Sequence, residues 1–459
     1  MKNQGAMTIE QEFITTHPKC QQCYRRLKEL IPGGVSHDAR YMTPFPLFLA
    51  RGEGSKVWDV DGNEYIDYHP GMVNQLLGHR HPAIVAALTE QLSKGLEFGA
   101  CDELEIQAAE LIIEMVPCAE QVRFTCSGAE ANELAIRLAR AYTGKSKIIR
   151  FRGHWHGGFN EGLAAVAVPF DVPYSAGLTE DVFSNLLLAD HNNIEDVRRF
   201  AERGDVAGLL LESMGAHTVV MPYRPGFLEE VRQITKEKGI VLISDEVFTN
   251  FRFAPGGAQE VTGIIPDLVT LGKPLGAGMP VSGVAGKKDI MQKLAFTGDS
   301  EYDRHHRVRW QGTHSGSPIA LAATVANLEV LKTGEVQAQM NRHGAMLRKG
   351  LNEQIKQHNI PGCVYGHYSA NRIFLNHNCP YLDKCNREPC INPDHEFLDK
   401  GMPNSLRNPF RLAMFLNGIN NPTGGGWLIN TGAMTDEDIE KTVEAFDRSL
   451  ARLKAEKIL

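Results

Sequence analysis

The chain of 459 residues lacks any apolar stretch that approaches the roughly 20 residues a membrane-spanning helix requires. It also lacks a basic excess. Its 48 Lys and Arg stand against 55 Asp and Glu, and a net charge of −7 argues against a nucleic-acid-binding surface. The N-terminus shows no apolar segment typical of a signal peptide. We therefore expect a cytoplasmic protein with neither a membrane nor a nucleic-acid partner.

The sequence also lacks the even set of cysteines that marks a secreted disulfide framework, because its nine cysteines are odd in number and dispersed. Cys20 and Cys23 form an isolated Cys-x-x-Cys. A second group is crowded within nineteen residues and consists of His377, Cys379, Cys385, Cys390 and His395. Neither spacing matches a standard zinc pattern. We expect the crowded segment to be an irregular surface insertion, with a structural metal as the alternative, and we assign no metal ligand.

The length and a hydrophobic content of 42% suit a large α/β domain with a smaller appendage. Residues 1–35 have a polar helical pattern, and 44–68 alternate around Asp61-Gly62 as a hairpin does. Further on, helical patterns alternate with apolar strand candidates, which are Gln121–Cys126, Lys147–Phe151, Ala207–Leu211, Val241–Ser244, Asp267–Leu271 and Pro280–Ala285. This alternation predicts βαβ units and a mostly parallel, buried sheet.

We accordingly expect three parts: an arm and part of a small domain over 1–75, a large domain over 76–330, and a small C-terminal α+β region over 331–459. The last part ends in a charged amphipathic helix, Thr435–Lys457. The chain shows no internal repeat and no low-complexity tract.

Two of the apolar runs lead to side chains of opposite charge, a lysine and an aspartate. Lys273 follows one run and precedes a glycine-rich turn, and Asp245 ends another. A buried lysine that can lose its proton, beside an acid at a neighbouring strand end, is what pyridoxal phosphate (PLP) chemistry needs. The lysine holds the aldehyde as a Schiff base, and the acid keeps the pyridine nitrogen protonated. Taken alone, such a lysine is usually a solvated strand end.

Ser127, Gly128 and Ala129 stand where a strand gives way to a clear helix. A helix N-terminus offers backbone N–H groups and a positive dipole end, which suit a phosphate. The alternative is an ordinary helix cap with Ser127 satisfying backbone donors. Both interpretations place these residues at the same edge of the sheet.

Trp155 lies between glycines in a loop that follows another strand, so its ring could stack on a flat ligand. A packed aromatic at a turn is the alternative. His154 and His156 flank it and could suggest a zinc pair, but they lie only two residues apart and lack other ligands nearby.

Glu212 ends a further strand, and Gln311-Gly312-Thr313 precedes an Ala-rich helix. Thr313 could contact a phosphate, or the segment could be a plain loop before a helix-start proline. Ligands of open parallel sheets lie outside the carboxyl ends of the strands. The convergence of Ser127, Glu212, Asp245 and Lys273 on strand ends therefore predicts the site.

Together these residues resemble the class III aminotransferases of PLP fold type I, most of all the glutamate-1-semialdehyde aminomutase subgroup. The resemblance runs from about Ile31 to Leu331 and is weaker beyond. Its motifs include Pro32-Gly-Gly-Val, Trp58-Asp-Val-Asp-Gly-Asn, Leu77-Gly-His-Arg-His-Pro82, Ser127-Gly-Ala-Glu-Ala, Trp155-His-Gly, Asp245-Glu-Val, Leu271-Gly-Lys and Gln311-Gly-Thr. The last of these, Gly-Gly near 425 and the Phe446-Asp-Arg tail also resemble D-phenylglycine aminotransferase.

The resemblance implies a large domain with a mostly parallel sheet and a smaller α+β domain built from both ends of the chain. It implies that Lys273 is the Schiff-base lysine, that Asp245 partners the pyridine nitrogen, and that Val247 and Trp155 cover the two ring faces. It further implies that Ser127 and Gly128 bind the phosphate. The remaining implied assignments are that Ala129 and Glu212 lie near the cofactor and that Thr313 reaches the phosphate of a second subunit in a homodimer with shared sites.

Some positions depart from the family pattern. Glu212-Ser213 stands where the family usually has Glu-Pro, and Gly424-Gly-Gly-Trp427 stands where aminomutases carry an acidic residue. Arg40 falls where aminomutases have their carboxylate-binding arginine, and a guanidinium fork matches a carboxylate. A surface arginine is the alternative for Arg40.

We expect a PLP-dependent aminotransferase that moves an amino group between an amino acid or amine and a keto acid. An intramolecular aminomutase with the same lysine is the first alternative. A non-catalytic binding protein of the same fold is a second, and the intact lysine and aspartate speak against it. The sequence does not identify the donor, the acceptor or the stereochemistry.

Overall fold

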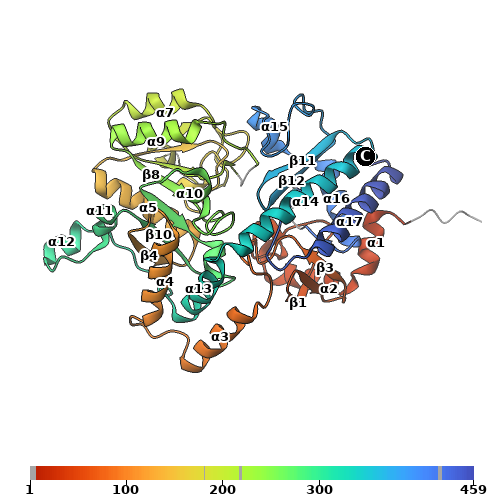
Figure 1. The fold of residues 1–459 in the computed structure, drawn as a ribbon, viewed down its shortest axis with the longest axis horizontal. Coiled ribbons are helices and arrows are strands. Elements are labelled where there is room, and N and C mark those ends of the chain that lie inside the picture. Colours follow the sequence, from red (N-terminus) through yellow and green to blue (C-terminus); the bar gives the residue numbers. More distant parts are fainter. Residues whose placement is uncertain (1–6, 180, 217–219, 422–425) are drawn as a thin grey trace, which may run out of the picture. The chain divides into compact units, whose positions relative to one another are not determined.

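The computed structural model describes residues 7–179, 181–216, 220–421 and 426–459. They divide into two compact units (Figure 1). The large unit comprises Pro82–Ala338 and Pro393–Asp399, and the small unit comprises the chain up to His81 together with Gln339–Asn392 and Lys400–Leu459. No helix in the described ranges is both long and apolar enough to cross a membrane.

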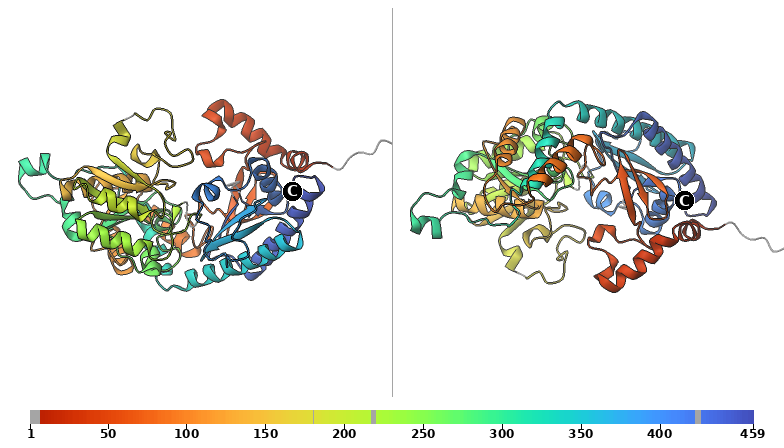
Figure 2. Two further views of the ribbon diagram at one scale, coloured as in Figure 1. Left: turned by 90° about the horizontal axis from the view of Figure 1, so that it is seen from above. Right: turned by 90° about the horizontal axis from the view of Figure 1, so that it is seen from below.

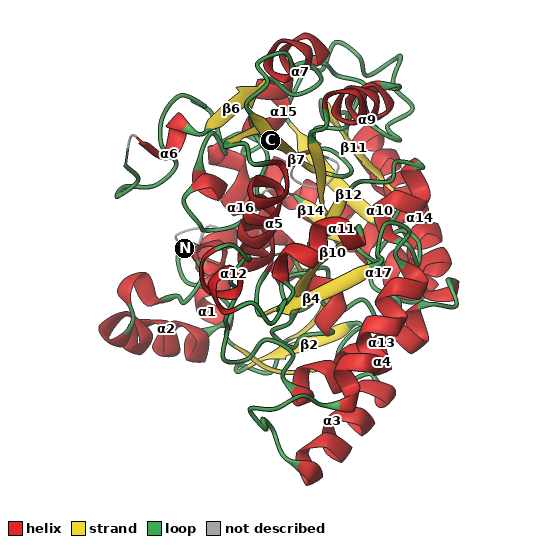
Figure 3. Ribbon diagram, turned by 90° about the vertical axis from the view of Figure 1, so that its left-hand side faces the viewer, coloured by secondary structure: helices red, strands yellow, loops and turns green. Residues whose placement is uncertain are grey.

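A seven-stranded sheet forms the centre of the large unit, in the order β4-β10-β9-β8-β7-β5-β6 (Figure 3). Strand β10 pairs antiparallel with β4 and β9, and the other pairs are parallel. The expected mostly parallel sheet is confirmed, with one strand, β6, that we did not assign from the sequence. The strands are β4 (Gln121–Thr125), β5 (Lys147–Phe151), β6 (Leu186–Ala189), β7 (Val206–Glu212), β8 (Val241–Asp245), β9 (Leu268–Leu271) and β10 (Ser282–Gly286).

Helices cover both faces of this sheet, because successive residues of a strand point to opposite sides. Ile148 packs in a core with α5 (Gly128–Thr143). Ile149, the next residue of β5, packs instead with α7 (Ile194–Ala201) and α9 (Phe227–Lys238) (Figure 1). The strands are therefore apolar along most of their length, as buried parallel strands are.

Further helices of the large unit surround these layers. They are α3 (Pro82–Lys94), α4 (Glu103–Met115), α6 (Asp181–Ser184), α10 (Gly257–Thr262), α11 (Lys288–Met291), α12 (Ser300–His305) and α13 (Pro318–Leu331), with short 3₁₀ turns η3 (Glu161–Leu163), η4 (Lys273–Gly276) and η5 (Gln292–Leu294). Helix α15 (His395–Lys400) begins in the inserted segment of this unit.

The small unit contains two sheets. The first is β1 (Leu49–Glu53), β2 (Lys56–Asp59), β3 (Glu64–Asp67) and β13 (Ile419–Asn420), and the second is β11 (Gly362–His367), β12 (Ala370–Leu375) and β14 (Trp427–Ile429). Its helices are α1 (Ile9–Thr16), α2 (Pro18–Leu30), α14 (Glu335–Gln357), α16 (Asn404–Leu416) and α17 (Asp436–Ala455), with turns η1 (Pro32–Gly34) and η2 (Asp38–Arg40). Helices α1 and α2 follow one another at the red end of the chain (Figure 2). The hairpin around Asp61-Gly62 is confirmed by the antiparallel pairing of β2 with β3.

Parallel strands β5, β7, β8 and β9 end at one edge of the large sheet. In the register of the strands, Glu212 of β7 pairs with Asp245 of β8, and Asp245 pairs with Thr270 of β9. Lys273 follows three residues after Thr270. The sheet therefore sets two carboxylates and a lysine side by side at its carboxyl edge.

Candidate active site

The backbone of Lys273, which follows strand β9, is strained. Its φ of 32° lies in the left-handed region, which a residue with a side chain rarely adopts and which is found most often at functional sites. Burial lowers the pKa of Lys273, the nearby carboxylates of Asp245 and Glu212 oppose that fall, and Arg252 adds to it. The net effect is a pKa below the ordinary value, which favours the neutral, nucleophilic amine.

Asp245 is buried and hydrogen-bonded at both carboxylate oxygens. Its Oδ2 lies 2.7 Å from His156 Nδ1 and accepts a hydrogen bond from Asn132 Nδ2 at 2.8 Å. Its Oδ1 accepts from the Val247 amide at 3.0 Å. Burial alone would raise the pKa of Asp245, but the bonds and charge of His156, then the Val247 amide and Asn132, bring it below its ordinary value. Asp245 is therefore held as a carboxylate.

Asn132 connects four segments of the site. Besides Asp245, its Nδ2 donates to the carbonyl of His156 at 2.9 Å, and its Oδ1 accepts from the Thr270 hydroxyl at 2.8 Å. It lies on α5 and is 1% exposed, so a single amide fixes that helix, the loop after β5, and strands β8 and β9. Sequence reasoning missed Asn132, because a polar residue inside a helical pattern usually indicates a solvent-facing position.

The helix α5 begins at the same edge. Ser127 is its N-cap, with its hydroxyl accepting from the Glu130 amide at 3.3 Å, so the helix-cap interpretation of Ser127 is confirmed. A Cβ at Gly128 would lie 2.6 Å from Val247 Cγ1, and one at Gly272 would lie 3.1 Å from the same atom. Val247 thus lies between the start of α5 and the residue before Lys273, and the glycine at 128 permits that approach.

The loop after β5 packs against the same helix start. A Cβ at Gly157 would lie 2.7 Å from the Cβ of Ala129, so this loop and the first turn of α5 are in contact. The buried guanidinium of Arg150 fixes this loop by donating hydrogen bonds to the carbonyls of His154, at 2.6 Å, and Glu161. Sequence reasoning missed Arg150 because it lies within an apolar strand.

Trp155 and Glu212 are linked directly. The Trp155 amide donates to Glu212 Oε1 at 2.7 Å. The residue as a whole is 40% exposed, and its ring meets Tyr174 edge to face at 6.2 Å. The carbonyl of Glu212 accepts from the Tyr223 hydroxyl at 2.9 Å. The backbone of Trp155 is therefore fixed, and its ring keeps an accessible face.

A chain of buried histidines supports Glu212. The Glu212 amide donates to His154 Nδ1 at 3.1 Å, which leaves the proton of His154 on Nε2. That Nε2 lies 3.1 Å from His191 Nδ1, and His191 Nε2 lies 3.3 Å from the carbonyl of Pro222. Each ring therefore accepts one hydrogen bond and donates another, and both rings are neutral. Burial and the nearby His395 lower the pKa of His191 to about 3. Both ring nitrogens of His154 therefore have hydrogen-bond partners within the chain.

Thr313 and Arg40 are the remaining predicted site residues. Thr313 is exposed. Burial and Glu130 raise the pKa of Cys126, and the neighbouring Ser315 side chain and His314 backbone oppose that rise, so the Thr313 loop lies near the strand–helix junction. Arg40 belongs to the small unit, where it ends the exposed turn η2. Their assignments to phosphate and substrate remain predictions.

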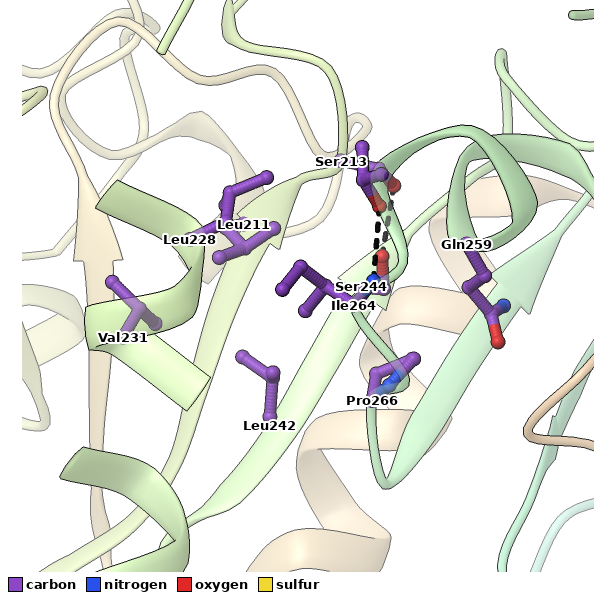
Figure 4. Close-up of a pocket in the computed structure, with 10 residues that line it drawn as sticks. Leu211, Ser213, Leu228, Val231, Leu242, Ser244, Gln259, Ile264 and Pro266 are labelled. Carbon is purple, nitrogen blue, oxygen red and sulfur yellow. Dashed lines mark hydrogen bonds between the residues drawn. The ribbon is translucent and has the colours of Figure 1, made fainter. Parts of the chain in front are cut away.

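Ser213, where the resembled family has proline, joins two strand ends. Its hydroxyl donates to the carbonyl of Asp245 at 3.0 Å. The same hydroxyl lies 2.8 Å from Ser244 Oγ (Figure 4). Beneath these serines is a small pocket whose walls are mostly apolar, including Leu211, Leu242 and Ile264. None of the predicted site residues lines it. The serine thus supports the backbone that carries Asp245, and the pocket is separate from the site.

Cys20, Asp59 and Asp61 are the one set of three potential metal donors that lie within 4.8 Å of one another in the described ranges. Their oxygens are occupied by hydrogen bonds. Asp61 accepts the amides of Lys19 and Cys20, while Asp59 accepts those of Asp61 and Asn63 and the Tyr65 hydroxyl. Burial raises the pKa of Cys20 to about 12, which keeps its thiol protonated. These groups cap α2 and close the hairpin.

Comparisons with known proteins agree with this geometry. The sequence model of the aminotransferase class-III family matches residues 37–367. A glutamate-1-semialdehyde 2,1-aminomutase from Methanosarcina acetivorans is 37% identical over 447 residues, which cover 95% of this chain and 99% of the relative. An omega-transaminase from Sphaerobacter thermophilus has a TM-score of 0.86 and 29% identity, covering 96% and 99% of the two chains. A transaminase solved with PLP bound has a TM-score of 0.83 and 27% identity, covering 96% and 98%.

Proposed function

The chain belongs to the class III aminotransferase family, and from this premise we propose that it moves an amino group between an amino acid or amine and a keto acid. It is an enzyme with pyridoxal phosphate as its cofactor. The observation that carries the proposal is the pairing of Lys273 and Asp245 at adjacent strand ends, where the pKa of each group lies below its ordinary value. The site thus combines a neutral amine with a charged carboxylate, as this chemistry requires.

The residues present fit this cofactor. The N-terminus of α5 offers its dipole and first amides to a phosphate. The lack of a side chain at Gly128 allows Val247 to pack against the start of this helix. Val247 offers an apolar surface to one ring face, and the partly exposed Trp155 offers an aromatic surface to the other. Glu212 lies beside Asp245 in the strand register, at the same edge.

When bound, the cofactor supplies an aldehyde that takes up the amino group and a ring that withdraws electrons from the carbon that loses its proton. Lys273 would hold the cofactor covalently through its Nζ, and its free amine would carry the proton between the substrate carbon and the cofactor carbon. Asp245 would hold a proton at the ring nitrogen, and Asn132 and His156 keep its carboxylate charged and oriented.

Three finer assignments belong to the same proposal. Arg40 binds the substrate carboxylate through its guanidinium fork. The active form is a cytoplasmic homodimer in which Thr313 contributes to the phosphate site of the partner subunit. The position of the Thr313 loop beside Cys126 supports the link between this loop and phosphate binding, because Cys126 directly precedes Ser127. Sedimentation at working concentration tests the dimer, and a fully active species of single-chain mass would refute it.

The second candidate is an intramolecular aminomutase, which the 37% identity to a glutamate-1-semialdehyde aminomutase over nearly the whole chain favours. We prefer transamination because Gly424-Gly-Gly-Trp427 stands where the mutases have an acidic pattern, and a composition of small residues beside an aromatic one suits a bulky, apolar substituent. Gly424 and Gly425 lie outside the described residues, while Trp427 opens β14.

The two candidates differ in whether a free amino acid is released. The pyridoxamine form of the enzyme is mixed with a panel of keto acids, and release of the matching amino acid is followed. Transamination predicts stoichiometric release with consumption of the acceptor. Conversion of glutamate-1-semialdehyde to 5-aminolevulinate without an acceptor would instead establish the mutase.

A further inference from the structure

Four cysteines gather in the small unit around the segment that we expected to be an irregular insertion. Cys379, Cys385 and Cys390 lie in a stretch without helix or strand between β12 and α15. The Cys385 thiol donates to the carbonyl of Pro389 at 3.9 Å. Burial raises the pKa of Cys390 to about 12, and the neighbouring Cys385 and Cys379 add to that rise. Asn392 bridges two of the sulfurs, with its amide N–H 3.5 Å from Cys390 Sγ and its Nδ2 3.5 Å from Cys379 Sγ.

The fourth cysteine comes from a distant part of the sequence. Cys363 lies on β11 and is buried. The Gly366 amide of the same strand donates to the carbonyl of Arg387 at 3.1 Å, which places the cysteine-containing segment beside β11. In keeping with that position, burial raises the pKa of Cys363 to about 12, and the neighbouring thiols of Cys390, Cys379 and Cys385 contribute to the rise. The linear spacing of 379, 385 and 390 resembles no zinc pattern because the fourth member precedes it by sixteen residues and arrives through the fold.

Backbone and side-chain N–H groups face three of the loop sulfurs. Cys385 Sγ accepts from the Arg387 amide at 3.3 Å, and Cys390 Sγ accepts from the Asn392 amide, so the same contact with the second following residue occurs twice. With the side chain of Asn392 on Cys379, three sulfurs receive N–H donors. Metal binding releases the protons of its thiol ligands, and these N–H donors would then face the sulfurs of metal-bound thiolates.

We propose that Cys363, Cys379, Cys385 and Cys390 form a binding site for one soft divalent metal ion, with Zn²⁺ as the expected occupant. Four sulfurs in a tetrahedral set are typical of zinc, and the N–H groups of Arg387 and Asn392 would offset the charge of the metal-bound thiolates. The ion fixes an irregular segment that joins β12 to α15, which is a structural role.

Binding requires the segment to contract. No three of the four sulfurs lie within 4.8 Å of one another. Zinc–sulfur bonds of about 2.3 Å bring the sulfurs of a tetrahedral site to roughly 3.8 Å. Residues 376–392 therefore move inward around the ion, and hydrogen exchange of their amides should slow when zinc is added.

The test is the metal content of the purified full-length chain before and after loading with Zn²⁺ and exhaustive dialysis. We expect about one zinc per chain in the parent protein. Cys379→Ser and Cys390→Ser should each lose it, while the matched controls Cys23→Ser and Cys101→Ser, which lie outside the cluster, should retain it. Titration of the metal-free parent with Co²⁺ should produce thiolate-to-cobalt charge-transfer absorption, which reports ligation even where a variant folds poorly.

A parent chain that stays free of zinc and gives no such absorption would overturn the site. Equal zinc in the cysteine variants and the controls would do the same. A disulfide among these cysteines in the freshly purified protein, found by peptide mapping without reduction, or bound iron with inorganic sulfide in place of zinc, would also reject it. Removal of pyridoxal phosphate leaves the expected zinc content unchanged, so this outcome is independent of the proposed function.

Discussion

The side-chain amide of Asn132 donates to the carboxylate of Asp245 across 2.8 Å, although 113 residues separate them in the sequence. Because Asn132 also bonds the carbonyl of His156 and the hydroxyl of Thr270, the orientation of Asp245 depends on the first turns of α5. A mutation of Asn132 can therefore disturb this hydrogen-bond network while the carboxylate of Asp245 stays in place.

Replacing Asn132 by Ala should therefore impair the enzyme without removing Asp245. We expect a loss of about 1–3 kcal/mol in the free energy of unfolding, because buried partners lose their hydrogen bonds. Turnover should fall as well, since Asp245 is no longer oriented. Denaturant unfolding and steady-state kinetics measure both effects. Asn160→Ala is the matched control, because Asn160 is exposed in the same unit, and an Asn132→Ala enzyme that behaves like it would contradict the network.

Asp245→Asn should slow turnover by orders of magnitude while the cofactor still binds. The neutral amide does not hold a proton on the ring nitrogen, so the ring withdraws electrons less well. Cofactor content by absorbance and single-turnover rates with an amino donor distinguish binding from chemistry. Turnover at the parent rate would show that Asp245 has another role.

Lys273→Ala should fold and still take up the cofactor, but without a covalent link. Borohydride reduction of the parent enzyme followed by peptide mapping should place the pyridoxyl label on the peptide that contains Lys273, and the variant should carry none. A label on any other lysine would reject the assignment.

The buried histidine chain predicts a pH dependence of stability. The pKa of His191 lies at about 3 in the folded chain, below the value of about 6.5 expected when unfolded. Above that upper value the ring is neutral in both states. Below that pH only the unfolded chain takes up the proton on His191. The contribution of His191 therefore lowers the free energy of unfolding progressively as the pH falls to about 3.

His191→Phe removes this proton site and preserves a ring that can stack on Tyr223. The variant loses the hydrogen bond from His154, so it should be less stable than the parent at pH 7.5. Its deficit should shrink as the pH is lowered from 7 to 4. Thermal unfolding across this range measures the difference, and a deficit that stays constant or grows toward low pH would contradict a neutral His191.

Arg40→Ala should raise the Michaelis constant for carboxylate substrates much more than for simple amines, because only the former lose a bidentate partner. Arg51→Ala, another arginine of the small unit, is the control. An equal effect of Arg40→Ala on both substrate classes would shift the role to another arginine, and the segment 304–309 offers candidates.

How far the sequence predicted this site depends on where each residue lies. Lys273, Asp245 and Glu212 were visible because each follows an apolar run, and the parallel order of those runs places their ends together. Asn132 was hidden within an amphipathic helix. The pairing of His154 with His191 was also hidden, because it joins loops that periodicity does not relate. Strand β6 escaped assignment because four apolar residues fit a helix as well as a strand.

The segment Pro393–Asp399 belongs to the large unit although its neighbours on both sides belong to the small one. Within that unit the ring of His395 meets the ring of His191 edge to face, at 4.6 Å between centroids. A gene fragment that encodes only 82–338 would therefore produce a large unit in which His191 lacks its contact with His395 and is more exposed to water. Anyone who wishes to study that unit in isolation should add the seven missing residues as a peptide, and the increase in its melting temperature would report how much they contribute.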